Sequence, residues 1–179
     1  MYLTKKLDIK NQHIRLLNIA PDYAIQKKLN SLPNIDYISI DLDSSLAMQK
    51  ADLTNLTFEA NSFDAIICYH VLEHIENDRK AISELFRVLK PKGWAIIQTP
   101  FERNREITFE NPLIQSSKER IKLFGQGDHV RVYGSDYFER LEEVGFVVKE
   151  DDFINLFSEA EIQRQVLDKS ELMCFCSKK

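Results

Sequence analysis

Short apolar runs alternate along this chain with segments of helical periodicity. Runs rich in apolar and β-branched residues, bounded by polar or turn residues, predict strands over 14–19, 35–40, 63–68, 94–98, 146–149 and 172–176. Between the runs, apolar residues recur at intervals of three and four, which predicts helices after Asp22, from Asn77 to Leu89, over 117–124 and over 133–144. Asp22 directly precedes the first of these helices, and we expect its carboxylate to cap that helix.

This alternation predicts an α/β fold with a doubly wound, mostly parallel sheet, because a helical crossover between strands makes them parallel. Ligands of such sheets bind outside the carboxyl ends of the strands. We therefore expect function in the loops that follow the strands, over 20–24, 41–43, 51–53, 68–74 and 99–101.

Composition narrows the class of protein. The length of 179 residues fits one domain over 1–179, and 24 Lys+Arg against 28 Asp+Glu give a net charge of −4 without a block of like charge. We therefore expect neither nucleic acid nor a membrane surface as a partner. No signal-peptide pattern opens the chain, and Cys68, Cys174 and Cys176 lie in apolar surroundings, which favours buried, reduced thiols and a cytoplasmic location.

A distinctive pattern occupies residues 61–100, NSFDAIICYHVLEHIENDRKAISELFRVLKPKGWAIIQTP. Its order of SFD, apolar strand, VLEH, charged helix, RVLKPKG and second apolar strand resembles the class I S-adenosylmethionine-dependent methyltransferases, in particular the small-molecule type 11 family. ADLTNLTF before it and HVRVYG with DYFERLEEVGF after it are similar to the same family. The resemblance implies a Rossmann-like fold of about seven strands with an antiparallel last strand. It also implies S-adenosylmethionine as cofactor and a small-molecule or sugar-like acceptor.

The first strand departs from the family pattern of an acidic residue followed by a G-x-G-x-G loop. Asn18 replaces the acidic residue, and Ala20, Asp22 and Ala24 stand at the glycine positions. By their positions, Asn18, Ala20 and Asp22 would contact the cofactor. Glycine serves in such loops because the backbone turns tightly and approaches the ligand closely. We expect alanine to be tolerated if φ is negative, and Asp22 to be the larger departure.

Carboxylates follow the next two strand ends. Asp41 comes 21 residues after Ala20, close to the offset of about 20 residues at which an acidic residue reaches the ribose in dinucleotide folds. A carboxylate suits a diol because it accepts two hydrogen bonds. Asp43 competes for the same role. Asp52 and Leu53 lie where the family holds the adenine, although an aspartate is also common in a plain turn.

The floor of the cofactor pocket is expected at Cys68, Tyr69 and His70, which end the strand over 63–68. Tyr69 would offer an aromatic face to a sulfonium, as in cation–π contacts, or would simply pack.

The same segment also allows a zinc site. His70, Glu73 and His74 match H-x-x-E-H, an inverted zinc-protease motif. That motif needs one continuous helix, whereas here it follows a strand directly. We therefore predict no metal and keep a zinc hydrolase built on these residues as a lesser alternative.

The acceptor side is expected in the loop over 125–131, whose two glycines permit a cover over the pocket. His129 is the candidate catalytic base, and Arg131 the candidate contact to an anionic acceptor. A histidine at a helix start and a solvated arginine are the alternative interpretations. The sequence thus favours methyl transfer from S-adenosylmethionine, and the alternative from another class is a catalytically inactive cofactor-binding or interaction module.

Overall fold

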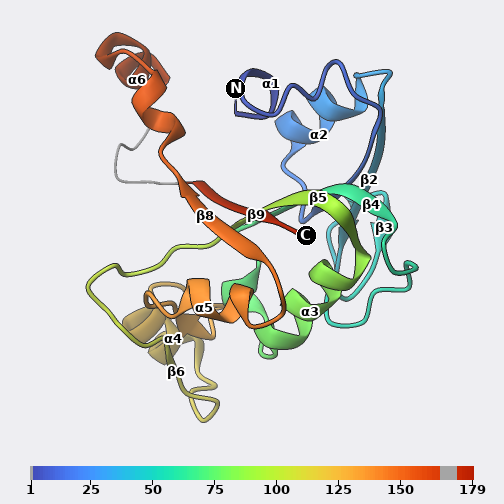
Figure 1. Cartoon of the computed structure of the whole chain (residues 1–179). Coiled ribbons are helices and arrows are strands. Elements are labelled where there is room, and N and C mark those ends of the chain that lie inside the picture. The colour runs from blue at the N-terminus through green and yellow to red at the C-terminus, as the bar shows by residue number, and fades with distance from the viewer. Residues whose placement is uncertain (1, 166–172) are drawn as a thin grey trace.

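A seven-stranded sheet organises the computed structural model, which describes residues 2–165 and 173–179 (Figure 1). In sheet order the strands are β3 (Gln49–Lys50), β2 (Ile35–Asp41), β1 (Ile14–Ile19), β4 (Phe63–Tyr69), β5 (Leu89–Gln98), β9 (Met173–Ser177) and β8 (Val147–Asp151). The five neighbouring strands β3, β2, β1, β4 and β5 pair in parallel. Strand β9 pairs antiparallel with both β5 and β8. The predicted fold class and the antiparallel last strand are confirmed.

Helices cover both faces of this sheet. Figure 1 shows α1 (Tyr2–Lys5) and α2 (Tyr23–Asn30) on one side, with α3 (Asp78–Val88) and α5 (Tyr137–Glu142) on the other. The remaining elements are the short helices η1 (Leu72–His74) and η2 (Phe153–Leu156), the helices α4 (Ser117–Phe124) and α6 (Glu159–Gln165), and a two-stranded sheet of β6 (Phe109–Glu110) and β7 (Arg131–Val132).

The apolar packing on the two faces of the sheet follows from the alternation of side chains along each strand. On one face Ile14 and Leu16 of β1 pack with Leu29 of α2. On the other face Leu17 and Ile19 pack in the cluster that contains the apolar stripe of α3. Central strands that are buried on both faces read as continuous apolar runs, which is why these strands were the clearest in the sequence.

Two helices start where the sequence places them. The carboxylate of Asp22 accepts hydrogen bonds from the backbone N–H groups of Ala24 and Ile25, at 2.8 and 3.2 Å, and so caps α2 as predicted. Asn77 caps α3 by accepting from the backbone N–H of Lys80 at 3.1 Å.

The prediction of a helix over 133–144 is wrong in its first turn, because α5 begins only at Tyr137. Long-range contacts hold the preceding residues out of the helix. The phenol of Tyr133 donates to Asp78 at 2.7 Å, and the backbone N–H of Gly134 donates to the hydroxyl of Thr108 at 3.2 Å. A periodicity of three and four cannot reveal such contacts.

The strand predicted over 94–98 is the last part of β5, which begins already at Leu89 and whose pairing with β4 is irregular. The residues over 90–93, expected to lie between helix and strand, are therefore an irregularity inside β5. The strand predicted over 172–176 is found as β9, while Leu172 itself lies outside the described residues. Within 2–165 and 173–179, no helix is long and apolar enough to cross a membrane.

Candidate functional site

A cavity of about 570 Å³ opens at the carboxyl ends of β1, β2 and β4, at the edge of the sheet where the sequence predicts function. This volume lies within the range of small-molecule sites. Its lining contains the predicted residues Ala20, Asp41, Asp52, Leu53 and His70, the competing Asp43, and His74 of the H-x-x-E-H motif. It adds Ile19, Leu42, Ala51, Val71, Ile75 and Asp128. The sequence thus located this cavity, although it did not assign all of its walls.

The loop after β1 differs from our expectation at Ala20. Its φ is +49°, in the left-handed region that favours glycine, so the alanine stands in a strained conformation rather than one with negative φ. Its backbone N–H still donates to the carbonyl of Ile40 at 2.8 Å, which extends the pairing of β1 with β2. Ala20 therefore holds a backbone conformation that a glycine would adopt without strain.

Asn18 lies in the interior beneath this loop. Its amide donates to the phenol of Tyr37 at 2.9 Å, and that phenol donates to Gln26 of α2 at 3.3 Å. Gln26 also accepts from the hydroxyl of Ser39 at 2.8 Å. Neither Asn18 nor Asp22 is among the residues that line the cavity. The structure gives Asn18 a place in this buried network and Asp22 the capping of α2.

Of the two carboxylates after β2, Asp41 is the one held by backbone hydrogen bonds and the less exposed. Its Oδ1 accepts from the backbone N–H groups of Asp43 and Ser44, both at 2.8 Å, which closes a turn and fixes the carboxylate at the cavity wall. Asp43 is exposed. An acceptor that is already oriented loses less entropy when it binds a ligand, so Asp41 fits a ribose diol better than Asp43.

Asp52 and Leu53 form the neighbouring wall. Oδ1 of Asp52 accepts from the backbone N–H and the hydroxyl of Thr54, both at 2.8 Å, in a tight turn. Leu53 is buried in the cluster that contains α3. The turn interpretation of Asp52 therefore holds, and its position in the cavity wall leaves a contact to a base compatible with it.

The three residues at the end of β4 have separate environments. Cys68 is fully buried, and burial raises the pKa of its thiol well above the ordinary value. Tyr69 lines a second cavity, of about 240 Å³, between α2, β4 and β5. Apart from Lys28 and the two tyrosines Tyr2 and Tyr69, the lining of that cavity is entirely aliphatic or thioether. Only His70 reaches the first cavity, from a left-handed conformation with φ of +55°.

The carboxylate of Glu73 is buried beside this cavity. It accepts from the hydroxyl of Thr99 at 2.8 Å and contacts Nδ1 of His70 at 3.2 Å. Burial by itself raises the pKa of Glu73, but the hydrogen bonds from His70, its own backbone and Thr99 outweigh burial and hold the pKa below its ordinary value. Glu73 is therefore a buried carboxylate that is ionised at neutral pH.

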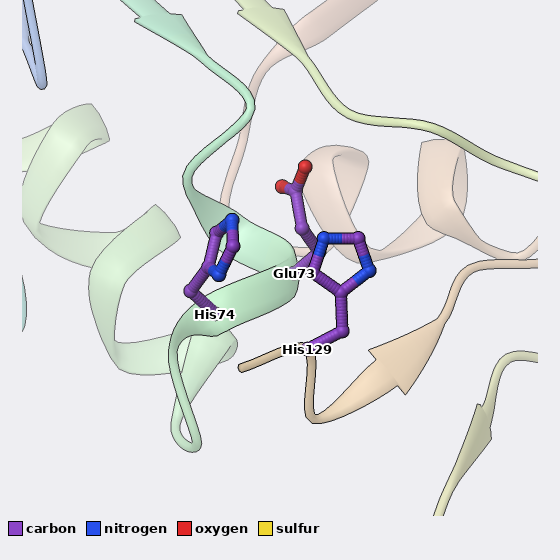
Figure 2. A group of neighbouring side chains, drawn as sticks. All are labelled: Glu73, His74 and His129. Atoms are coloured by element: carbon purple, nitrogen blue, oxygen red, sulfur yellow. The ribbon is translucent and has the colours of Figure 1, made fainter. Parts of the chain in front are cut away.

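His129 lies beside Glu73 and His74 (Figure 2), with its ring at 4.7 Å from the ring of His74, edge to face. It is 7% exposed and, unlike His74 and Asp128, is not among the residues that line the first cavity. The loop over 125–131 thus reaches the cavity through Asp128, next to the residue that the sequence singled out. His74 and Asp128 were present in H-x-x-E-H and in the G-Q-G-D-H loop, but only their contacts reveal where they lie.

Arg131 is buried rather than solvated, and each of its guanidinium nitrogens has a partner within the chain. It donates to Glu110 at 2.8 Å, to the carbonyls of Leu72 and Glu76 at 2.9 and 2.8 Å, and to the carbonyl of Ile75. These contacts fasten the segment around β7 to η1. They give Arg131 a role in the fold and leave an acceptor contact by its side chain without support.

The zinc-hydrolase interpretation lacks the helix that it needs. His70 follows β4 directly, and η1 covers only Leu72–His74, so no continuous helix carries both histidines. Residues 68–74 instead form a strand end, a left-handed residue and one short turn.

Residues 11–97 match the sequence profile of a family described as "Methyltransferase domain". The demethylmenaquinone methyltransferase of Clavibacter sepedonicus is 40% identical over 55 residues, which make up 31% of this chain and 22% of that protein. The sterol 24-C-methyltransferase of Kluyveromyces lactis is 28% identical over 140 residues, or 73% of this chain and 36% of that protein. The chain therefore matches between 22% and 36% of the length of these curated relatives.

A solved structure extends the likeness to the rest of the chain. The S-adenosylmethionine dependent methyltransferase from Mesorhizobium loti superposes with a TM-score of 0.64 at 13% identity, over 93% of this chain and 92% of that one. At this identity the likeness establishes the fold, including the strands after residue 97.

Proposed function

We propose that this chain is a class I S-adenosylmethionine-dependent methyltransferase that transfers a methyl group from S-adenosylmethionine to a small-molecule acceptor, as the match of residues 11–97 to a methyltransferase-domain family supports. The observation that carries the proposal is the cavity at the carboxyl ends of β1, β2 and β4, where doubly wound sheets bind their ligands.

The chemistry of the cavity lining fits this cofactor. S-adenosylmethionine carries a positive sulfonium, an ammonium, a ribose diol and an exocyclic amine, which together need acceptors and negative charge. The lining supplies the carboxylates of Asp41, Asp43, Asp52 and Asp128. Among the described residues, no lysine or arginine lines this cavity. Ile19, Leu53 and Val71 add apolar surface for the base.

We assign the ribose to Asp41 and the adenine to the wall of Asp52 and Leu53. The turn that fixes Oδ1 of Asp41 leaves its second oxygen to accept from a diol. The amino-acid end of the cofactor has fewer partners, because Asp22 already occupies the N-terminus of α2, where an anionic group would bind. The adenosyl part therefore dominates binding.

When bound, the cofactor would supply a methyl group on a sulfonium, and an acceptor would attack the methyl carbon in line with the departing sulfur. The chain contributes orientation and the exclusion of water. For an acceptor that must lose a proton, His74 is better placed than His129, because His74 is part of the cavity wall.

The aliphatic cavity beside Tyr69 favours an acceptor with an apolar body over a sugar-like one. Curated relatives named for demethylmenaquinone and for a sterol support the same choice, over the parts that they share with this chain.

Asp41→Asn tests the cofactor site. An amide oxygen can still accept from the backbone N–H groups of Asp43 and Ser44, whereas the amide nitrogen cannot accept from a ribose hydroxyl. We expect the affinity for S-adenosylhomocysteine in a calorimetric titration to fall by roughly 10- to 150-fold. The matched Asp43→Asn variant is expected to bind like the parent protein.

Equal losses in both variants, or no loss in Asp41→Asn, would contradict the assignment of the ribose. If the parent protein does not bind S-adenosylhomocysteine at millimolar concentration, the inactive interaction module becomes the better interpretation. If it binds but transfers no methyl group to any apolar or sugar-like compound in a labelled-cofactor screen, the inactive module is again favoured.

A further inference from the structure

We propose that Glu73, His74 and His129 form a binding site for a first-row divalent cation, with Zn²⁺ as the best match. One potential ligand atom from each of the three residues lies within 4.8 Å of the others. Figure 2 shows the imidazoles of His74 and His129 on either side, with the carboxylate of Glu73 above and between them. Glu73 and His129 are buried and His74 is partly exposed, so a cation would be enclosed on one side and reachable from the other.

Both imidazoles are held in the tautomer that a metal requires. Nδ1 of His129 lies 3.1 Å from the carbonyl of Phe124, and a carbonyl can only accept, so Nδ1 carries the proton. Nδ1 of His74 lies 3.2 Å from the carboxylate of Asp128, which fixes the same tautomer. The lone pair of each ring is therefore on Nε2. Histidine ligands are oriented in this way when their second nitrogen donates to a carbonyl or a carboxylate.

The third ligand is oriented as well. The hydroxyl of Thr99 and Nδ1 of His70 both contact the carboxylate of Glu73, and each oxygen has one of these partners. Such outer contacts hold a metal-binding carboxylate in place and still leave lone pairs on its oxygens. His70 thus acts on the site through Glu73 and is not itself a ligand.

Long-range contacts bring the two segments together. The backbone N–H of Val130 donates to the carbonyl of Glu73 at 2.9 Å. The neighbouring Arg131 binds the carbonyls of Leu72, Ile75 and Glu76. These bonds fasten the loop that carries His129 directly onto η1, which carries Glu73 and His74. The buried Arg131 therefore holds His129 close to Glu73 and His74.

Two neutral imidazoles and one carboxylate are a ligand set of intermediate softness, which suits Zn²⁺ better than Mg²⁺ or Ca²⁺. Bonds of about 2.1 Å in a tetrahedron require ligand atoms about 3.4 Å apart, so ligand atoms that lie within 4.8 Å of one another must approach by up to about 1.4 Å when the cation binds. Three protein ligands leave a fourth position open. Nε2 of His74, like Nε2 of His129, can serve as a metal ligand or as a general base, but not as both at once.

The four histidines of the chain provide a matched set of variants for the test. Protein freed of metal with a chelator is titrated calorimetrically with Zn²⁺ in the absence of cofactor. We expect one Zn²⁺ per chain with a Kd of about 10 µM or lower. His74→Ala is expected to weaken binding by about 100-fold or more, because even losing an outer partner of a ligand costs about 10- to 100-fold. The exposed His13→Ala variant is expected to bind like the parent, and His70→Ala, which removes an outer partner of Glu73, is expected to weaken binding by about 10-fold, less than His74→Ala does.

A second readout covers the buried ligand. If His129→Gln unfolds, as circular dichroism would reveal, Co²⁺ added to the parent protein reports its ligands through visible absorption bands. We expect these bands in the parent and in His13→Ala, and their loss in His74→Ala. The proposal is overturned by absence of stoichiometric binding in the parent, by unchanged binding in His74→Ala, or by a loss in His70→Ala as large as that in His74→Ala. That last result would restore the H-x-x-E-H set in place of the one proposed. Because no cofactor is present, none of these outcomes depends on the methyl-transfer proposal.

Discussion

At the scale of single residues, Ala20 carries a cost that a glycine loop avoids. A left-handed conformation costs an L-residue about 1–2 kcal/mol, partly offset by the greater chain entropy of an unfolded glycine. We therefore predict that Ala20→Gly raises the free energy of unfolding by about 0.5–1 kcal/mol in urea titrations. The same replacement at Ala24, inside α2, should lower it by about 0.5–1 kcal/mol. Destabilisation of both variants would show that Ala20 is not strained.

The roles and conformations of some of these residues could be predicted from the sequence, and those of others could not. Asp22 was predictable as a cap because an N-cap depends on local chemistry: a short acceptor side chain directly before a helix. The φ of Ala20 was not, because alanine gives no local signal for a left-handed turn. From their residue types and positions, the sequence analysis expects Asn18 to contact the cofactor and Arg131 to contact an anionic acceptor. Their partners Tyr37 and Glu110 are distant in the sequence, so only the folded chain reveals that both side chains are engaged in the interior.

At the scale of elements, α3 is joined to the loop before β4 by a charged pair. Glu84 accepts from Arg87 at 2.8 Å and from the backbone N–H of Leu56 at 2.8 Å. Arg87 in turn donates to the carbonyls of Leu56 and Phe58 at 2.9 and 2.7 Å. This pair fastens the segment that follows Asp52 and Leu53, and so supports one wall of the cavity.

Its contribution should depend on pH. The hydrogen bond from Arg87 is the main cause that holds the pKa of Glu84 below its ordinary value, against the opposing effect of burial. A depressed carboxyl pKa stabilises the folded state above the unfolded pKa of about 4.3, and this stabilisation is lost as pH falls through the folded pKa. We predict that Glu84→Gln lowers the free energy of unfolding at pH 7 by about 1–3 kcal/mol.

The difference between Glu84→Gln and the parent should shrink as denaturant titrations are repeated from pH 7 down to pH 3. Glu59→Gln, at an exposed position in the same loop, is the control and should change stability little at any pH. A difference for Glu84→Gln that stays constant down to pH 3 would mean that its charge contributes nothing to the fold.

Elements were predictable wherever one local pattern decided them. Buried strands such as β1 and β4 and the apolar stripe of α3 follow from periodicity and burial. The first turn expected for α5 failed because Tyr133 and Gly134 are held by Asp78 and Thr108. The short β6 and β7 gave no signal, because strands of two residues are too short for a period to appear.

At the scale of the whole molecule, strand–helix alternation and the family resemblance were enough for the fold and for the edge of the sheet that holds the cavity. They were not enough for the cluster of Glu73, His74 and His129, because 55 residues separate His74 from His129 and only the contacts of Val130 and Arg131 bring them together. Local sequence signals therefore locate the cavity that we propose for the cofactor, while the proposed cation site beside it depends on tertiary structure.

We propose that S-adenosylmethionine occupies the cavity at the carboxyl ends of β1, β2 and β4. Hydrogen–deuterium exchange of the full chain, with and without saturating S-adenosylhomocysteine, tests it most directly, because bound ligand slows exchange where it orders the backbone. We predict slower exchange over 19–24, 41–44 and 51–54, and little change over 147–151 at the far edge of the sheet. Unchanged exchange in the three loops, or protection confined to the residues around the aliphatic cavity, would contradict the account.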